Sequence, residues 1–162
     1  MTNDPQTVAW LDQEDAHLAR TIRAHRWAVQ LVGPGDGPDE PAFAYTIGLF
    51  GLGHPELVIV GMGAGNTHAL LDQCASMVAD GRDLMAGELL TWPDWPGLRM
   101  VVEGLPNPGE VVLGANRFYE RPAEYSVPAY QLTWAHPGHG FPWEEGETCG
   151  PTVQPRPGTW RA

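Results

Sequence analysis

An unbroken run of four aliphatic residues, Leu57-Val58-Ile59-Val60, constrains the fold of this chain more than any other segment. A strand with one face in water alternates apolar and polar side chains, whereas a strand covered on both faces reads as a continuous apolar run. The turn-forming segment Gly51-Leu52-Gly53-His54-Pro55 comes directly before the run and separates it from the preceding apolar segment. The sequence therefore predicts a central strand over residues 56–62 that is buried on both faces.

Shorter apolar segments, separated by glycine and proline, predict the elements around this strand. Strand segments are rich in β-branched or aromatic residues, and helix segments repeat apolar residues at helical spacing. Short strands separated by turns predict an α+β fold with a curled, mostly antiparallel sheet of about six strands, open or closed into a split β-barrel, and three flanking helices. We expect further strands at residues 27–32, 43–49, 84–92, 98–103 and 129–135, and helices at residues 5–26, 66–81 and 107–119.

Residues that commonly cap helices stand at the start of each helix segment. Their side-chain oxygens accept hydrogen bonds from the first backbone N–H groups, which have no partner within the helix. The expected caps are Asp4, Asn66 or Thr67, and Asn107.

The chain has the size of one domain with one core. It has 162 residues, and 43% of them are hydrophobic. We expect residues 1–26 to form an N-terminal helix and residues 27–135 to form the α+β core. Residues 136–162 are rich in glycine, proline and tryptophan, and we expect this tail to pack on the core.

The charge balance and the length of the apolar runs each argue against one class of partner. The formal net charge is −11, with twenty acidic residues against nine arginines and no lysine. Such a surface repels phosphate backbones, so nucleic-acid binding is not expected, whereas a cationic ligand or partner is favoured. No apolar run reaches the roughly 20 residues that cross a bilayer, and the acidic N-terminus is unlike a secretory signal. We therefore expect a cytoplasmic protein without membrane contact, with Cys74 and Cys149 reduced.

Several stretches, read together, carry a family resemblance. They are Phe43-Ala44-Tyr45-Thr46-Ile47-Gly48-Leu49, Gly53-His54-Pro55-Glu56-Leu57-Val58, Gln131-Leu132-Thr133-Trp134, Phe141-Pro142-Trp143 and Gln154-Pro155. The combination resembles the bacterial family catalogued as domain of unknown function 4262.

This resemblance covers the chain from Trp27 to Pro155 and implies no activity. The chain departs from the family pattern at one place. Family members usually carry Pro-Asp after the tryptophan that corresponds to Trp134, whereas this chain has Ala135-His136. If the acidic position serves a shared function, this protein has altered or lost it.

A looser resemblance is to flavin-reductase-like split barrels. There too a strand carrying a threonine precedes an apolar strand led by proline, a turn of small residues and a helix. This likeness implies FMN as the cofactor to test first, although a shared fold alone does not establish function.

The segment His54-Pro55-Glu56 places an imidazole and a carboxylate at the entrance of the central strand. Residues two apart on a strand point to the same side, so His54 and Glu56 are candidates for proton transfer. Tyr45 and Thr46 on the preceding strand are candidates for ligand binding, because a buried hydroxyl needs a partner. Alternatively, these groups satisfy the backbone of the turn, and the sequence leaves both interpretations open.

The glycine-rich turn over residues 61–66 joins the central strand to the second helix. Its backbone amides are able to approach a phosphate, so Gly63 and Asn66 are candidate ligand-binding residues. The turn fails the dinucleotide fingerprint, because Asn66 stands where the last glycine belongs. No arginine occurs between Arg26 and Arg82, so a plain tight turn is the alternative.

Histidines and tryptophans gather near the C-terminal tail. His136 and His139, with the distant Cys149, supply three metal-ligand types but no evident fourth ligand, so no zinc site is expected. His136 is a candidate catalytic base instead. Trp134 and Trp143 flank this loop and are candidates for stacking on a planar ligand, with filling of the core as the alternative.

The leading functional hypothesis is a small-molecule pocket at the strand ends, in an accessory or tailoring enzyme. One alternative is a non-catalytic protein-interaction module, such as an immunity or regulatory partner, and another is a flavin-binding oxidoreductase. A homodimer is left open. The residues expected to line the pocket are Tyr45, Thr46, His54, Glu56, Trp134 and His136.

Overall fold

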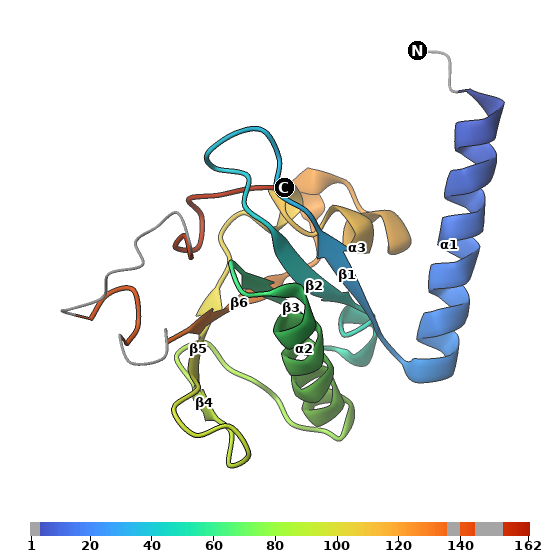
Figure 1. The fold of residues 1–162 in the computed structure, drawn as a ribbon. Helices are drawn as coiled ribbons and strands as arrows, with labels where there is room; N and C mark the ends of the chain where they lie inside the picture. Colours follow the sequence, from blue (N-terminus) through green and yellow to red (C-terminus); the bar gives the residue numbers. More distant parts are fainter. Residues whose placement is uncertain (1–3, 136–139, 145–153) are drawn as a thin grey trace.

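The computed structural model describes residues 4–135, 140–144 and 154–162, and its strands form one sheet (Figure 1). The strand order is β1-β2-β3-β6-β5-β4. The α+β class expected from the sequence is therefore confirmed. The strands are β1 (Ala28–Val32), β2 (Phe43–Ile47), β3 (Glu56–Val60), β4 (Leu89–Thr91), β5 (Arg99–Gly104) and β6 (Ala129–Trp134).

The sheet is mixed rather than mostly antiparallel, which corrects the expectation at its centre. β3 runs parallel to β6, and the other neighbouring strands pair antiparallel. A parallel pair needs a long crossover, and residues 61–128 supply it between the two central strands. Within the described residues β1 and β4 are the edges of an open sheet, so the split-barrel alternative is not confirmed.

The central strand is buried on both faces, as its unbroken apolar run predicts. Leu57 and Ile59 belong to the core on one face, and Val58 and Val60 belong to the core on the other. All four side chains are 0% exposed. Alternation of side chains along a strand sends every second residue to the opposite face, so an all-apolar strand requires two cores.

The helices divide between these two cores. They are α1 (Pro5–His25), α2 (Ala64–Ala79) and α3 (Leu113–Phe118). α2 buries Leu70, Leu71, Cys74, Ala75 and Val78 against the face that carries Leu57 and Ile59. α3 and the C-terminal Trp160 cover the opposite face. No helix within the described parts of the chain is long and apolar enough to cross a membrane.

α1 differs from the other helices because it has no buried residue. Figure 1 shows it standing at one side of the molecule, joined to the body near its C-terminal end. The side chain of Asp15 accepts two hydrogen bonds from Arg117 of α3, at 3.0 Å and 2.8 Å. This ion pair holds the middle of α1 toward the body, while Trp10 remains 58% exposed.

Three expected elements differ most from the structure. α2 begins at Ala64 after Gly63, and neither Asn66 nor Thr67 caps it. The expected strand over 84–92 is reduced to β4, because Gly87 adopts a left-handed conformation with φ of 91°. The expected helix over 107–119 is a 3₁₀ turn followed by α3, and Asn107 does not cap it. The Asn107 amide instead donates to the backbone carbonyl of Trp160 at 2.9 Å.

Candidate functional site

The carboxylate of Glu56 lies fully buried at the start of β3, surrounded by hydrogen-bond donors. Its Oε1 accepts from the Thr46 hydroxyl at 2.9 Å and from the Leu49 backbone N–H at 3.0 Å. Its Oε2 accepts from the backbone N–H groups of Gly48 at 3.0 Å and Phe50 at 3.2 Å. The Thr46 hydroxyl in turn accepts from the Leu57 N–H at 2.9 Å. This carboxylate therefore organises the turn between β2 and β3.

Any other residue type at Gly48 of this turn would be strained. Its φ is 130°, a region that favours glycine. A Cβ at this position would lie 2.4 Å from the backbone oxygen of Arg26. The glycine in the Tyr-Thr-Ile-Gly-Leu stretch is thus required by the close approach of the chain that leaves α1.

Burial raises the pKa of Glu56 from 4.5 to about 7, although its four hydrogen bonds act in the lowering direction. A carboxyl group with a pKa near neutral pH is able both to donate and to accept a proton, as a general acid or base does. The side chain is 0% exposed, so proton exchange with a bound molecule would require the turn to open. The catalytic assignment of Glu56 stays a prediction.

His54 is also buried, and both of its ring nitrogens have backbone partners. Nδ1 lies 2.7 Å from the carbonyl oxygen of Pro55, and Nε2 accepts the backbone N–H of Leu84 at 3.1 Å. This arrangement places the proton on Nδ1. The imidazole thus joins the turn before β3 to the segment that follows α2. Its exposed fraction is 4%, and its catalytic role likewise stays a prediction.

The remaining strand-end candidates lie on separate parts of the fold. The Tyr45 hydroxyl accepts the backbone N–H of Gly114 at 2.8 Å, in the core covered by α3. Gly63 precedes α2 as its N-cap residue, and Asn66 is exposed in the first turn of that helix. A Cβ at Gly63 would meet no atom within 4 Å, so close packing does not explain that glycine.

Trp134 belongs to the network that fastens the C-terminal tail to β6. Gln154 pairs with its backbone, accepting the Trp134 N–H at 2.8 Å and donating to the Trp134 carbonyl at 2.7 Å. Gln131 acts similarly: it donates to the Pro155 carbonyl at 2.9 Å and accepts the Trp160 indole N–H at 3.0 Å. The Gln131 and Gln154 stretches of the family pattern thus meet here in a structural contact.

Trp143 lies at the surface, with an exposed fraction of 48%, and its ring stacks with aromatic and cationic side chains. Its ring lies parallel to Phe141 with centroids 4.8 Å apart, and the guanidinium of Arg156 lies 4.6 Å from its centroid. Arg99 covers the Phe141 ring at 4.8 Å. The Trp143 ring is therefore stacked on Phe141, and the Arg156 guanidinium also lies over it. The predictions for His136, His139 and Cys149 lie outside the described residues.

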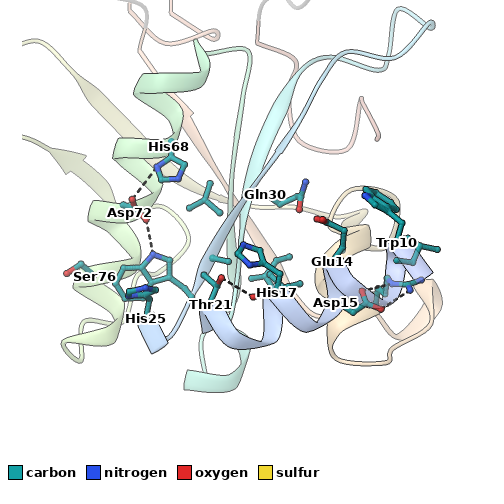
Figure 2. Close-up of a pocket in the computed structure, with 18 of the residues that line it drawn as sticks. Trp10, Glu14, Asp15, His17, Thr21, His25, Gln30, His68, Asp72 and Ser76 are labelled. Atoms are coloured by element: carbon teal, nitrogen blue, oxygen red, sulfur yellow. Dashed lines mark hydrogen bonds and ion pairs between the residues drawn. The ribbon is translucent and has the colours of Figure 1, made fainter. Parts of the chain in front are cut away.

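The structure contains a large groove elsewhere, between α1 and the side of the body formed by β1 and α2. Its volume is about 880 Å³, within the range of small-molecule sites. Figure 2 shows side chains of both helices directed into it. Tyr45, Thr46, His54, Glu56 and Trp134 are not among its lining residues. Polar side chains that line it include Glu14, His17, Gln30, His68 and Asp72.

A fixed hydrogen-bond chain forms the α2 wall of this groove. Asp72 accepts the indole N–H of Trp27 at 2.9 Å through one oxygen, and its other oxygen lies 3.2 Å from Nδ1 of His68 (Figure 2). The indole holds the carboxylate, and the carboxylate holds the imidazole. Asp–His pairs of this kind fix the tautomer of the imidazole, so that the remote nitrogen Nε2 is left as an acceptor.

Sequence reasoning missed this groove, although one signal was present. His68 and Asp72 are four residues apart on a predicted helix, which places them on the same face. The sequence did not show that Trp27 and the α1 residues lie near His68 and Asp72, because no local pattern indicates where α1 packs. The sequence instead predicted the site at the strand-end motifs, because these place polar residues next to apolar strands.

Metal and flavin chemistry find limited support in these residues. Over the described parts of the chain, no group of three or more histidine, cysteine or acidic side chains is placed to hold a metal ion. The FMN prediction comes from the likeness to flavin-reductase-like split barrels, and the glycine-rich turn before α2 contains no cationic side chain to hold its phosphate. It stays a prediction, to be tested by the colour of the purified protein and by tryptophan quenching on addition of FMN.

Comparison with known proteins agrees with the resemblance of the strand-end stretches. No curated protein and no solved structure matches the chain. A family model described as a domain of unknown function, DUF4262, matches residues 21–148. The match includes β1 to β6 and α2 but begins inside α1, so most of the outer wall of the groove precedes it. Since the match spans well over half of the sequence, the chain belongs to the DUF4262 family.

Proposed function

We propose that this protein is a small-molecule-binding domain whose ligand lies in the groove between α1, β1 and α2. The observation that carries the proposal is the groove itself, about 880 Å³ in volume and lined by both apolar and hydrogen-bonding side chains. Binding sites of this size usually combine an apolar lining with a few fixed polar groups. The Trp27–Asp72–His68 chain supplies such fixed groups.

The strand ends support this function less well. The polar atoms of Glu56 and His54 are engaged by backbone and side-chain partners, and the Tyr45 hydroxyl has a backbone donor. Hydrogen bonds already made inside the protein must be given up before the same atoms bind a ligand, which costs free energy. In the groove, His68 and Asp72 are about half exposed, with side-chain fractions of 50% and 46%.

A groove-filling variant tests the site. Thr21 of α1 lines the groove, whereas Ala24 on the same helix is exposed and lies outside the lining. Small aromatic fragments added to ¹⁵N-labelled protein should shift the indole N–H signals of Trp10 and Trp27 but not that of the buried Trp160. Thr21→Phe should abolish these shifts, and the control Ala24→Phe should retain them. Shifts that survive Thr21→Phe would place the site elsewhere.

A protein-interaction module is the second candidate, supported by a different surface. Around the edge strand β4, Met85, Leu89 and Trp95 are 64%, 52% and 36% exposed. An edge strand with apolar side chains is a common place for chains to associate. Sedimentation equilibrium of the protein and of Leu89→Lys tests self-association through this edge. A monomer at all concentrations for both proteins would rule out a homodimer built there.

A further inference from the structure

The groove follows the free edge of the sheet at β1. Three consecutive residues of this strand, Ala28, Val29 and Gln30, line it, although neighbouring side chains on a strand point to opposite faces. The lining also includes residues of α2, which covers one face of the sheet, and of α3, which covers the other. Surfaces from both faces meet only around an edge. β1 is the last strand on its side of the sheet, and α1 stands opposite it (Figure 1).

The pairing of β2 shows which backbone groups of β1 are free. The Gly61 N–H donates to the Ala42 carbonyl at 3.1 Å, so every second residue of β2 counted from Ala42 bonds to β3. The residues between them bond to β1. Their partners on β1 are Ala28, Gln30 and Val32. Because the bonding side alternates along a strand, Val29 and Leu31 direct their N–H and C=O groups to the open edge.

The printed hydrogen bonds of β1 agree with this assignment. The Leu31 carbonyl accepts from the side-chain amide of Gln30 at 3.1 Å, a contact open to a carbonyl that faces away from β2. Over residues 4–135, no hydrogen bond joins the backbone of β1 to α1. Val29 lies in the groove and therefore presents both a donor and an acceptor to it. Free groups of this kind on an edge strand are a template for a further strand.

The length of the groove favours an extended ligand over a compact one. Trp10 and His25 of α1 both line it, and the helix between them rises about 22 Å. Figure 2 shows Trp10 toward one end of the groove, and His25 and His68 toward the other. An extended chain advances about 3.3 Å per residue, so roughly six residues cover this length.

The two sides of the edge differ in character. The polar side chains on the α2 side are His68, Asp72, Gln73 and Ser76. The α3 side presents the apolar Leu18 and Ile47, together with the Asp15–Arg117 ion pair, whose charges cancel. Side chains of an added strand alternate between these two sides. The Asp72 carboxylate and the net charge of −11 favour cations on the α2 side.

We propose that the ligand is a short linear peptide that adds to β1 as a further strand, with cationic side chains toward α2 and apolar side chains toward α3. Val29 supplies the backbone hydrogen bonds. Because α1 stands opposite the edge, a single chain enters the groove, whereas the sheet edge of a second folded protein does not reach β1. This inference rests on the proposed function, because it needs the groove to be the binding site, and it names the class of ligand.

Two capped hexapeptides of equal length test the class and its charge: Ac-Val-Lys-Val-Lys-Val-Lys-NH₂ and Ac-Val-Glu-Val-Glu-Val-Glu-NH₂. Each is titrated into ¹⁵N-labelled full-length protein at pH 7.5 and low salt, with the Trp10 and Trp27 indole signals as the readout. We expect the lysine peptide to shift these signals and to bind at least several-fold more tightly than the glutamate peptide. Equal binding of the two would overturn the charge preference.

The aromatic fragments separate the failure of this inference from failure of the proposed function. If the fragments shift the indole signals and neither peptide does, the groove remains a site and the peptide class is overturned. If neither the fragments nor the peptides shift them, both proposals are overturned.

Backbone hydrogen exchange tests the addition of a strand. At roughly 90% saturation with the lysine peptide, exchange of the Val29 N–H should slow about tenfold, because only the free protein exchanges it. The Leu89 N–H is the matched control. Glu88 accepts from Val102 of β5, so Leu89 faces the free edge of β4, outside the groove, and its exchange should not change. Indole shifts without protection of Val29 would overturn strand addition.

Proline removes the donor at the open edge. An edge strand tolerates proline where the N–H faces outward, so Val29→Pro should keep the pairing of β1 with β2. The lysine peptide should bind roughly two- to tenfold more weakly, the range for one lost hydrogen bond. Leu89→Pro makes the same change on β4 and should bind like wild type. Undiminished binding by folded Val29→Pro would overturn the proposal; if this variant does not fold, the exchange of Val29 in wild type decides.

A charge-removing variant tests the orientation of the cationic side chains. Asp72→Asn keeps an acceptor for the Trp27 indole and removes the charge. It should weaken the lysine peptide about two- to fivefold, the usual range for a partly exposed charge pair. Asp80→Asn makes the same change at an exposed position of the same helix end, outside the groove, and should leave affinity unchanged. An equal loss in both variants would show that only the overall charge attracts the peptide, and would overturn the assignment to α2.

Discussion

Two polar regions of the molecule contrast sharply. Around the turn that joins β2 to β3, Thr46, His54 and Glu56 lie within the fold, at 0%, 4% and 0% exposure, with partners for their polar atoms. The groove beside α1 presents His68 and Asp72 about half exposed. The same residue types occur in both regions, yet one set holds the backbone together and the other faces an open volume. Residue type alone therefore does not separate a polar group that is bound within the fold from one that is open to a ligand.

Removing the Glu56 carboxylate should have the largest effect. Glu56→Ala leaves the Thr46 hydroxyl and the N–H groups of Gly48, Leu49 and Phe50 without their acceptor. We expect a loss of roughly 3–5 kcal/mol in the free energy of unfolding, measured by urea denaturation. Glu124→Ala, at an exposed position, should change it by less than about 0.5 kcal/mol. Similar values for the two variants would contradict the structural role.

The pH dependence of stability should carry the signature of Glu56. Its pKa is about 7 in the fold and 4.5 in the unfolded reference, so the folded state holds this proton more tightly. The stabilisation is complete below pH 4.5 and is lost as the pH rises through 7, by about 3 kcal/mol for this group. The difference in unfolding free energy between wild type and Glu56→Gln should fall over this window. A flat difference would show that the hydrogen bonds cancel the effect of burial on the pKa of Glu56, and a rising difference would show that they outweigh it.

His54 should come next in effect on stability. His54→Ala leaves the Leu84 N–H without its acceptor in a buried position. Such an unsatisfied group costs about 1–3 kcal/mol, measurable as a lower urea midpoint. His54→Asn keeps an acceptor on a shorter side chain and should recover part of the loss. Wild-type stability of His54→Ala would contradict this structural role.

The smallest effect on stability is expected at His68. Its half-exposed side chain contacts one carboxylate, so His68→Ala should alter the free energy of unfolding by less than about 0.5 kcal/mol. A change in ligand binding without a change in stability would complete the contrast with His54. A large destabilisation would mean that the groove wall is a structural element like the turn before β3.

Local patterns predicted the elements well where one segment carries the whole signal. The apolar run at residues 57–60 predicted a two-sided strand, and the helical spacing of Leu70, Leu71 and Cys74 predicted a buried helix face. Asp4 occupies the N-cap position of α1, as predicted, but its side chain makes no cap hydrogen bond. The cap predictions failed at Asn66 and Asn107, because backbone geometry and a distant carbonyl took precedence over local preference.

The sequence by itself determined most of the segments that form strands and helices, the two-sided burial of β3 and the acidic net charge. Only the tertiary structure decided that β6 lies parallel beside β3, that Glu56 and His54 serve the backbone, and that α1 stands off to leave a groove. The reason is physical: periodicity and turn chemistry act between residues close in sequence. The partner of a buried polar atom and the docking of a helix depend on residues brought together from far apart.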